Sequence, residues 1–279
     1  MKFAKFWVDV SVKVDKSIFG TNELSVWGAS NESLDLAIAH ATNRAEQLKM
    51  FANRGLDALR DYEYCNGYIR EEVLEEIKCS AGNTIAVMTR NNYGSLVINA
   101  ESVFFGDIDI PEVRFFDKIA QFFGKPEKNK TFYLDKIQKF QQRNSDYAFR
   151  VYETSAGLRL VVTNKVFDHK SAEAERLFNG LDIDPLYVRL CHAQSCFRAR
   201  LTPKPWRIGL CRPVSSYPRT DNKSLAEFSN WLKAYGSAAK AFRAVNLLAS
   251  FGDQSMHEHV SRVLDIHDKL ACSGGESLA

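Results

Sequence analysis

The chain has 279 residues, enough for one large domain or two small ones with a substantial core. Its 45% hydrophobic and 25% charged residues are ordinary for a soluble globular protein, and the net charge of +3 alone points to no partner. No stretch approaches the roughly 18 apolar residues of a membrane span, and the acids near the N-terminus do not suit a signal peptide. We therefore expect a cytoplasmic protein with no membrane partner.

The first 80 residues predict a small α/β unit. Apolar and polar residues alternate over 6–14, "GTNE" predicts a turn, and "LSVWGAS" predicts the returning strand. "SNES" is typical of a helix cap, for a helix that runs to about residue 59. The predicted inner stripe of that helix is Leu34, Ala37, Ile38, Ala41, Ala45 and Leu48. We interpret "REEVLEEI", residues 70–77, as a second, acidic helix.

Residues 81–220 predict an α+β core. "TIAVMTR" and "SLVINAES" flank the hairpin turn "NNYG", and "VFFGDIDI" follows as a third strand. We expect helices over 112–123 and 131–143, and then a second hairpin, "YAFRVYE-TSAG-LRLVVT". The last elements expected in this core are helices near 171–180 and 185–194, a short strand "CFRARLT" and a rigid loop "PKPWR".

Residues 221–279 predict helices packed on the core. An amphipathic pattern runs over 221–249, and a last helix covers 255–271 before a frayed tail, "CSGGESLA". The apolar stripe predicted for the first of these helices is Leu225, Phe228, Trp231, Leu232, Tyr235, Phe242, Val245 and Leu248.

An acidic pair stands at the end of the strand "VFFGDIDI". Asp107 and Asp109 share one face with Phe105, while Ile108 points to the other face. Two neighbouring carboxylates repel each other and raise each other's pKa. A divalent cation between them would relieve this repulsion, and so would an arginine or a helix N-terminus. The alternative is an ordinary solvated strand end.

Three segments resemble the archaeo-eukaryotic primase superfamily, which includes primase–polymerases and the polymerase domains of bacterial end-joining ligases. "FFGDIDIPE" looks like its acidic first motif, of the kind "DLDP" or "DIDV". "TSAGLRLVV" is similar to its second motif, a Ser and a His around a glycine in a hairpin, with Arg159 where the histidine would be. "CFRARLTPKPW" resembles the Arg-rich stretch of the ligase-associated members, so the resemblance covers residues 85–210.

The resemblance implies a two-hairpin sheet core like the primase catalytic fold, with a nucleotidyltransferase site. Asp107 and Asp109 would be catalytic and would hold Mg²⁺ or Mn²⁺, while Ser155 and Arg159 would hold a nucleoside triphosphate. An arginine can grip phosphate bidentately, so the exchange of histidine for Arg159 is compatible with binding. The third acidic motif is not evident, and its candidates Asp182 and Asp184 look like a helix cap.

A basic block runs from Arg189 to Arg219, with seven basic residues and no acidic one. Its candidates for contacting DNA or RNA are Arg198, Arg200, Lys204, Trp206 and Arg207. Here the arginines would contact phosphates and an exposed tryptophan would stack a base. The alternative is that Trp206 fills the core while the arginines pair with acids at 71–75. Arg90 and Tyr93 would line the same cleft, although we favour plain turn chemistry for them.

Cysteine and histidine patterns predict no metal centre or catalytic triad. "CHAQSC" with Cys211 offers four zinc ligands, Cys191, His192, Cys196 and Cys211, but their spacing matches no common zinc pattern, so we expect no zinc. The six histidines form no known motif, and we expect His257 and His259 on the surface.

The function we predict is the handling of nucleotide or nucleic-acid phosphates in a cleft with an acidic metal site, in its concrete form by a primase-like nucleotidyltransferase. This cleft is the open groove that we expect between the polar faces of the two hairpins, because their apolar faces must be covered by helices. Two alternatives stay open. One is a catalytically degenerate nucleic-acid-binding or regulatory protein of the same fold. The other is a metal-dependent nuclease that uses the same aspartates with water as the nucleophile.

Overall fold

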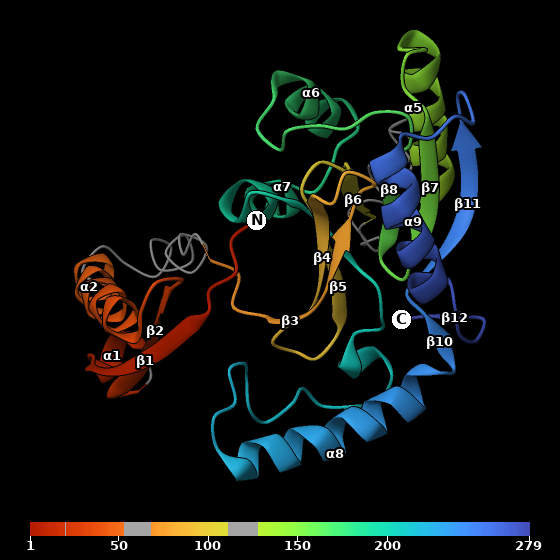
Figure 1. The fold of residues 1–279 in the computed structure, drawn as a ribbon. Coiled ribbons are helices and arrows are strands. Elements are labelled where there is room, and N and C mark those ends of the chain that lie inside the picture. The colour runs from red at the N-terminus through yellow and green to blue at the C-terminus, as the bar shows by residue number, and fades with distance from the viewer. Residues whose placement is uncertain (20, 53–67, 111–127) are drawn as a thin grey trace. The chain divides into compact units, whose positions relative to one another are not determined.

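The computed structural model describes residues 1–19, 21–52, 68–110 and 128–279 (Figure 1). The chain divides into two compact units, Met1–Glu71 with Ala193–Ser195, and Glu72–His192 with Cys196–Ala279. The division expected near residue 80 instead lies at Glu71, and the C-terminal helices belong to the second unit. None of the helices in the described ranges is long and apolar enough to cross a membrane.

The first unit is a β-hairpin with a helix packed on it. Its elements are β1 (Phe6–Lys13), α1 (Lys16–Phe19), β2 (Glu23–Ser30) and α2 (Leu34–Ala52). The helix lies very close to β2, since a Cβ on Gly28 would stand 2.1 Å from the Ala37 carbonyl oxygen. The predicted strands are confirmed, while the expected helical residues beyond Ala52 lie outside the described part.

Small side chains explain which part of the predicted α2 stripe is buried. Ala37, Ala41 and Ala45 are buried together with Leu48, as predicted. Leu34 is 52% exposed and Ile38 is 40% exposed, so their assignment to the inner stripe was wrong. Leu34 is the first residue of the helix, and Ile38 lies about 100° around the helix from Ala37.

The second unit contains two four-stranded antiparallel sheets, one in the order β3-β4-β5-β9 and the other in the order β11-β7-β8-β6. The strands are β3 (Glu72–Lys78), β4 (Thr84–Arg90), β5 (Leu96–Ala100), β6 (Phe105–Asp109), β7 (Phe149–Thr154), β8 (Gly157–Val162), β9 (Phe197–Arg200), β10 (Phe242–Arg243), β11 (Val245–Phe251) and β12 (Ser277–Leu278). The helices are α5 (Lys130–Arg143), α6 (Ala172–Gly180), α7 (Pro185–Gln194), η1 (Pro205–Arg207), α8 (Asn222–Ala239) and α9 (Glu258–Ala271).

The α+β class is confirmed, and both predicted hairpins are present as β4–β5 and β7–β8. They lie in different sheets, however, because β6 pairs with β8 instead of continuing the sheet of β5. The predicted helices near 131–143, 171–180, 185–194 and 255–271 are confirmed as α5, α6, α7 and α9. The helix expected at 112–123 lies outside the described residues.

Three predictions of local structure were wrong. Residues 70–77 do not form a helix: β3 is an edge strand paired with β4, and its glutamates remain largely in solvent. The helix expected to reach residue 249 ends at Ala239, and β11 pairs with β7. The tail is ordered, because β12 pairs with β10 and Ala279 is 1% exposed. In each case strand pairing outweighs a weak local preference, with the adjacent strand for β3 and with strands distant in sequence for β11 and β12.

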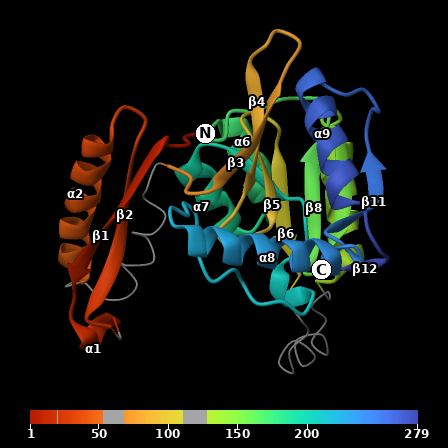
Figure 2. The same ribbon diagram turned by 60° about the horizontal axis from the view of Figure 1, so that its bottom comes forward.

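Helices cover both faces of the β11-β7-β8-β6 sheet. On one face Phe149 of β7 packs against Phe140 of α5, with the ring centres 6.2 Å apart. On the other face Tyr152 of β7 meets His267 of α9 at 4.9 Å, and α9 lies beside β8 in both views of the ribbon (Figures 1 and 2). The sheet is therefore an interior layer, and all six residues of β8 are buried.

Candidate functional site

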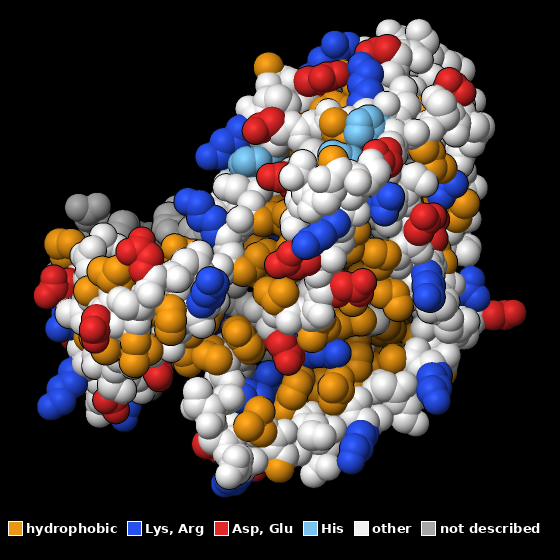
Figure 3. All heavy atoms as spheres, viewed as in Figure 1, with side chains coloured by type: hydrophobic (Ala, Val, Ile, Leu, Met, Phe, Trp, Pro, Cys, Tyr) orange, Lys and Arg blue, Asp and Glu red, His pale blue; other side chains and the backbone are white. Residues whose placement is uncertain are grey.

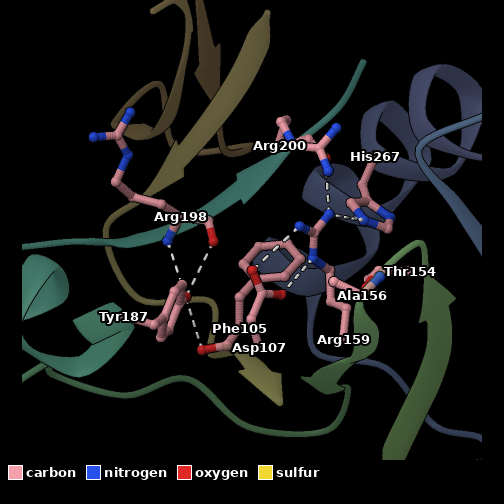
Figure 4. A network of polar contacts seen from close by, with 9 residues as sticks. All are labelled: Phe105, Asp107, Thr154, Ala156, Arg159, Tyr187, Arg198, Arg200 and His267. Atoms are coloured by element: carbon pink, nitrogen blue, oxygen red, sulfur yellow. Dashed lines mark hydrogen bonds and ion pairs between the residues drawn. The ribbon is translucent and has the colours of Figure 1, made fainter. Parts of the chain in front are cut away.

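The acidic strand β6 and the hairpin strand β8 are direct neighbours, as predicted. Asp107 stands opposite Arg159 in the ladder, and Asp109 stands opposite Gly157. Arg159 Nε donates to Asp107 Oδ1 at 2.9 Å, and Arg159 Nη1 donates to the Arg200 carbonyl at 2.8 Å (Figure 4). Because the Arg159 side chain is 3% exposed, this ion pair is shielded from solvent on the arginine side.

Helix α9 packs over the face of the sheet that carries Arg159. His267 is fully buried, with Nδ1 2.8 Å from Asp268 Oδ1 and Nε2 3.4 Å from Arg159 Nη1. Arginine can only donate, so Nε2 is the accepting nitrogen and Nδ1 carries the proton that Asp268 accepts. Burial, which is opposed by Asp268, lowers the pKa of His267, and the imidazole is therefore neutral at pH 7.

Asp268 joins α9 to β7. Its Oδ1 accepts from the Tyr152 hydroxyl at 2.8 Å, and its Oδ2 accepts from Arg150 Nη1 at 2.9 Å. Burial acts to raise the pKa of Asp268, but its contacts with His267, Tyr152 and Arg150 hold that pKa below the usual value. We call the set Asp107, Arg150, Tyr152, Arg159, His267 and Asp268 the buried network. Every charge in it has a partner, as burial requires.

The expectation of an open groove along the polar faces of the two hairpins was wrong. Helix α9 covers that face, because His267 and Asp268 supply the hydrogen bonds that its charged residues need. Arg159 and Ser155, which we expected to bind a triphosphate together, differ in their exposure to solvent. Ser155 is exposed in the β7–β8 turn, where its Oγ accepts from Arg207 Nη1, whereas Arg159 is buried.

One tyrosine hydroxyl links the two sheets where β6 and β9 lie side by side. Tyr187 of α7 places its hydroxyl 2.9 Å from the Phe105 carbonyl on β6 (Figure 4). The same oxygen lies 3.2 Å from the Arg198 amide and 3.1 Å from the Arg198 carbonyl on β9. Tyr187 therefore replaces backbone hydrogen bonds that the two edge strands do not make with each other at this point.

Three aspartates lie at the end of β6, where the Asp184 amide donates to the Asp107 carbonyl at 2.9 Å. Only the carboxylate of Asp109 is without hydrogen bonds among the described residues. Asp107 is paired with Arg159, and Asp184 caps α7 by accepting from the amides of Leu186 and Tyr187 at 3.0 and 3.2 Å. Asp109 is exposed, and partial burial together with Asp184 and Asp107 raises its pKa. The predicted cap role of Asp184 is confirmed.

These donors do not form a metal site as they are placed. The described residues contain no group of three or more His, Cys, Asp or Glu side chains arranged to hold a metal ion. Arg159 donates a hydrogen bond to the Asp107 carboxylate and so neutralises its charge, as a metal ion would. Mg²⁺ or Mn²⁺ binding thus stays a prediction. As for the cysteines, burial raises the pKa of the Cys191 thiol to about 12.

The basic block divides into two environments. Arg200 donates to the Thr202 carbonyl at 2.8 Å, and burial together with Arg159 lowers its pKa to about 10, so it remains charged inside the protein. The guanidinium of Arg198 points away from Arg159 (Figure 4). Lys204, Trp206 and Arg207 lie on and beside the η1 turn, where Trp206 is 45% exposed. The alternative that Trp206 fills the core was therefore wrong.

An aromatic pair with cations beside it forms the exposed counterpart of the buried network. Tyr93, from the β4–β5 turn, meets Trp206 edge to face at 5.3 Å. Arg212 lies 4.9 Å and Lys204 Nζ 5.6 Å from the centre of the Trp206 ring. We call Tyr93, Lys204, Trp206, Arg207 and Arg212 the Trp206 surface. Arg90, by contrast, serves the turn by donating to the Gly94 carbonyl at 2.9 Å, as predicted.

Apolar side chains are also exposed elsewhere on the second unit. The space-filling view shows hydrophobic side chains gathered around β3, β4, β5 and α8, with charged side chains between them (Figure 3). Val73, Leu74 and Leu225 are among the large apolar residues exposed on these elements. The Trp206 surface differs in that its ring is flanked by cations.

Sequence reasoning missed His267, Asp268, Tyr152 and Tyr187. A signal for His267 was present, because it continues the buried stripe of α9 formed by Val260, Val263, Leu264 and Ala271. A polar residue in an apolar stripe indicates a buried hydrogen-bonding partner. His257 and His259, expected on the surface, are half-buried, and His257 Nδ1 caps α9 by accepting from the His259 amide.

Comparisons with family models, curated proteins and solved structures found no significant match to this chain.

Proposed function

We propose that this protein binds single-stranded nucleic acid at the Trp206 surface. The observation that carries the proposal is a tryptophan that is 45% exposed and has two cations within 6 Å of its ring, Arg212 at 4.9 Å and Lys204 at 5.6 Å. A nucleic-acid base presents a flat π-face that can stack on the exposed part of such a ring.

The charges of this surface suit a phosphate backbone. Within the described ranges, Lys204 and Arg212 make no ion pair with an acidic side chain, so both cations are available to a ligand. Burial, Arg200 and Arg207 lower the pKa of Lys204, and Asp109 and Asp107 oppose this only in part, so positive charges are crowded here. An anionic ligand would relieve that repulsion, and single-stranded nucleic acid combines phosphates with stacking bases.

We expect a preference for single strands because the Trp206 ring would stack on a base. Bases in a duplex are stacked on each other, so an exposed tryptophan reaches a base face only at an unpaired nucleotide. Ser155 and Arg207, which are hydrogen-bonded to each other beside Lys204, extend the polar part of this surface. In this proposal the bases stack near Trp206 and the phosphates contact Lys204, Arg207 and Arg212.

Fluorescence anisotropy with labelled oligo-dT and oligo-U tests this proposal. Trp206→Ala should weaken binding about 5–150-fold, the equivalent of roughly 1–3 kcal/mol for one stacked base. Trp206→Phe should retain most of the affinity. Lys204→Gln should reduce the slope of log affinity against log salt by about 0.7, the value for one phosphate contact on a single strand.

Exposed Lys233 of α8 supplies the matched control, since Lys233→Gln removes one positive charge from a residue that is not among the cations beside the Trp206 ring. It should leave both affinity and salt slope nearly unchanged. If the parent protein binds neither oligonucleotide at low salt, or if Trp206→Ala binds as well as the parent, the proposal is wrong.

A second candidate function, a primase-like nucleotidyltransferase, is supported by the pairing of β6 with β8, which sets Asp107 opposite Arg159 as the resemblance requires. Asp109 is the carboxylate left for a metal, beside Lys204 and Arg207, whose charges oppose the rise in its pKa. Nucleotide incorporation on a primed template with Mg²⁺ or Mn²⁺, abolished by Asp109→Asn, would support it. Cleavage of the oligonucleotide without added triphosphate would instead indicate a nuclease.

A further inference from the structure

A second candidate site lies on α5, away from the side chains discussed so far. A cavity of about 320 Å³ opens between one face of α5 and the end of α6. Gly180 and six residues of α5 line it: Phe132, Asp135, Lys136, Lys139, Phe140 and Arg143. These helix positions recur at spacings of three and four, so they form a single face about three turns long.

Gly180 keeps this cavity open. A Cβ at this position would stand 2.6 Å from Phe140 Cε2, so any larger residue would press on the ring or displace it. The Phe132 and Phe140 rings are half-buried, and their remaining surface faces the cavity. The result is an apolar floor with room for a flat group.

Positive charge surrounds the floor. Lys136 is neutralised by Asp182, with the Nζ and Oδ2 atoms 2.6 Å apart. Lys139 and Arg143 are exposed, and neither makes an ion pair or a side-chain hydrogen bond with any residue that the structure describes. Asp135 is the only acid among the described lining residues, so these residues carry a net positive charge.

We infer that this cavity binds a small organic phosphate that carries a flat ring, of the nucleoside monophosphate class. The ring would lie on Phe140 beside Gly180, and the phosphate would bind Lys139 and Arg143. A phosphate monoester carries a charge of about −1.5 to −2 at pH 7, which matches two cations better than a carboxylate does. The volume lies at the lower end of the range of small-molecule sites, roughly 300–1,000 Å³.

Isothermal titration of the full chain with adenosine monophosphate, adenosine and inorganic phosphate tests the inference. Adenosine monophosphate should bind more tightly than either fragment. Lys139→Gln and Arg143→Gln should each weaken its binding at least about fivefold, a typical loss for one charge-assisted contact. Adenosine should be unaffected by both changes, because it has no phosphate. Lys233→Gln is the charge-matched control and should change nothing.

Gly180→Ala should displace the Phe140 ring and weaken binding, and the two charge variants keep the test valid if that variant folds poorly. Trp206→Ala separates this inference from the proposed function, because it should leave the affinity for adenosine monophosphate unchanged. If adenosine monophosphate does not bind the parent, or binds Lys139→Gln and Arg143→Gln as tightly as the parent, the inference is overturned. Binding lost only in Trp206→Ala would also overturn it, by placing the ligand on the Trp206 surface.

Discussion

Arginine has opposite roles in the buried network and on the Trp206 surface. Arg159 is 2% exposed, and its guanidinium is shared among Asp107, the Arg200 carbonyl and His267. Arg212 is exposed and lies over aromatic rings with no acid paired to it in the described ranges. The first arrangement uses protein groups to satisfy a charge, whereas the second leaves a charge for a ligand. Residue type alone does not distinguish them.

Removing the acid from the buried pair should have the largest effect on stability. Asp107→Asn leaves the Arg159 charge buried without its counter-charge, and we expect the free energy of unfolding to fall by roughly 2–3 kcal/mol. This loss is smaller than is usual for a fully buried ion pair, because the Asp107 side chain is 33% exposed. Urea unfolding without metal measures it.

The same variant distinguishes whether Arg159 or a metal ion balances the charge of Asp107. If a cation holds the acidic pair, Asp107→Asn should stabilise the metal-free protein by removing repulsion, and the parent should gain stability from Mg²⁺ or Mn²⁺. A stabilised variant would therefore contradict the pairing with Arg159. Equal melting temperatures of the parent with and without metal would count against the metal site.

Loss of the hydroxyl between the sheets should have an intermediate effect. Tyr187→Phe leaves the Phe105 carbonyl and the Arg198 backbone groups short of a partner, which costs about 1–2 kcal/mol. Tyr133→Phe on α5 is the matched control, because Tyr133 is 5% exposed and its hydroxyl has no hydrogen bond to any described residue. Chemical unfolding of the two variants should separate them; equal losses would refute the bridging role.

Replacing the exposed Asp109 should change the free energy of unfolding least, and it should raise it instead of lowering it. The folded-state pKa of Asp109 is raised, so the native state holds its proton more tightly than the unfolded state does. Its ionisation therefore destabilises the protein as pH rises through the unfolded and then the folded pKa. Asp109→Asn should be more stable at neutral pH by less than about 1 kcal/mol, with no difference at a pH below both values.

The same change should strengthen oligonucleotide binding at neutral pH, because it removes a negative charge beside Lys204 and Arg207. Parallel unfolding and anisotropy titrations between acid and neutral pH measure both effects. Weaker binding by Asp109→Asn in the absence of metal would show that Asp109 contacts the ligand directly.

Alternation along a strand predicted which side chains share a face, but not what covers that face. Asp107 and Arg159 lie on the same face, as their alternation with Ile108 and Leu158 predicted. The pattern contained no information that α9 would return over the same face with His267 and Asp268. Burial of a polar face depends on whether distant residues satisfy it, and this is a property of the tertiary fold.

The errors at β3 and β11 have a related origin. Glu72, Glu75 and Glu76 suit a solvated helix as well as an edge strand, and only the pairing with β4 decides between them. Likewise, the apolar residues of β11 continue the spacing of α8 by chance, and the free edge of β7 determines their structure. The Trp206 surface was partly foreseen from Trp206 and its basic neighbours, while the contact with Tyr93 required the fold.

The exchange of strands between the two sheets has a consequence for how the chain folds. β6 leaves the β3–β5 segment to pair with β8, and β9 returns from beyond β8 to pair with β5, where Val97 lies opposite Arg200. Neither sheet can therefore be completed from a continuous stretch of chain. Contacts between residues so far apart in sequence close large loops, and such topologies fold slowly. The second unit should accordingly refold slowly and in a single step. If the chain is cut between β6 and β7, neither fragment should fold by itself.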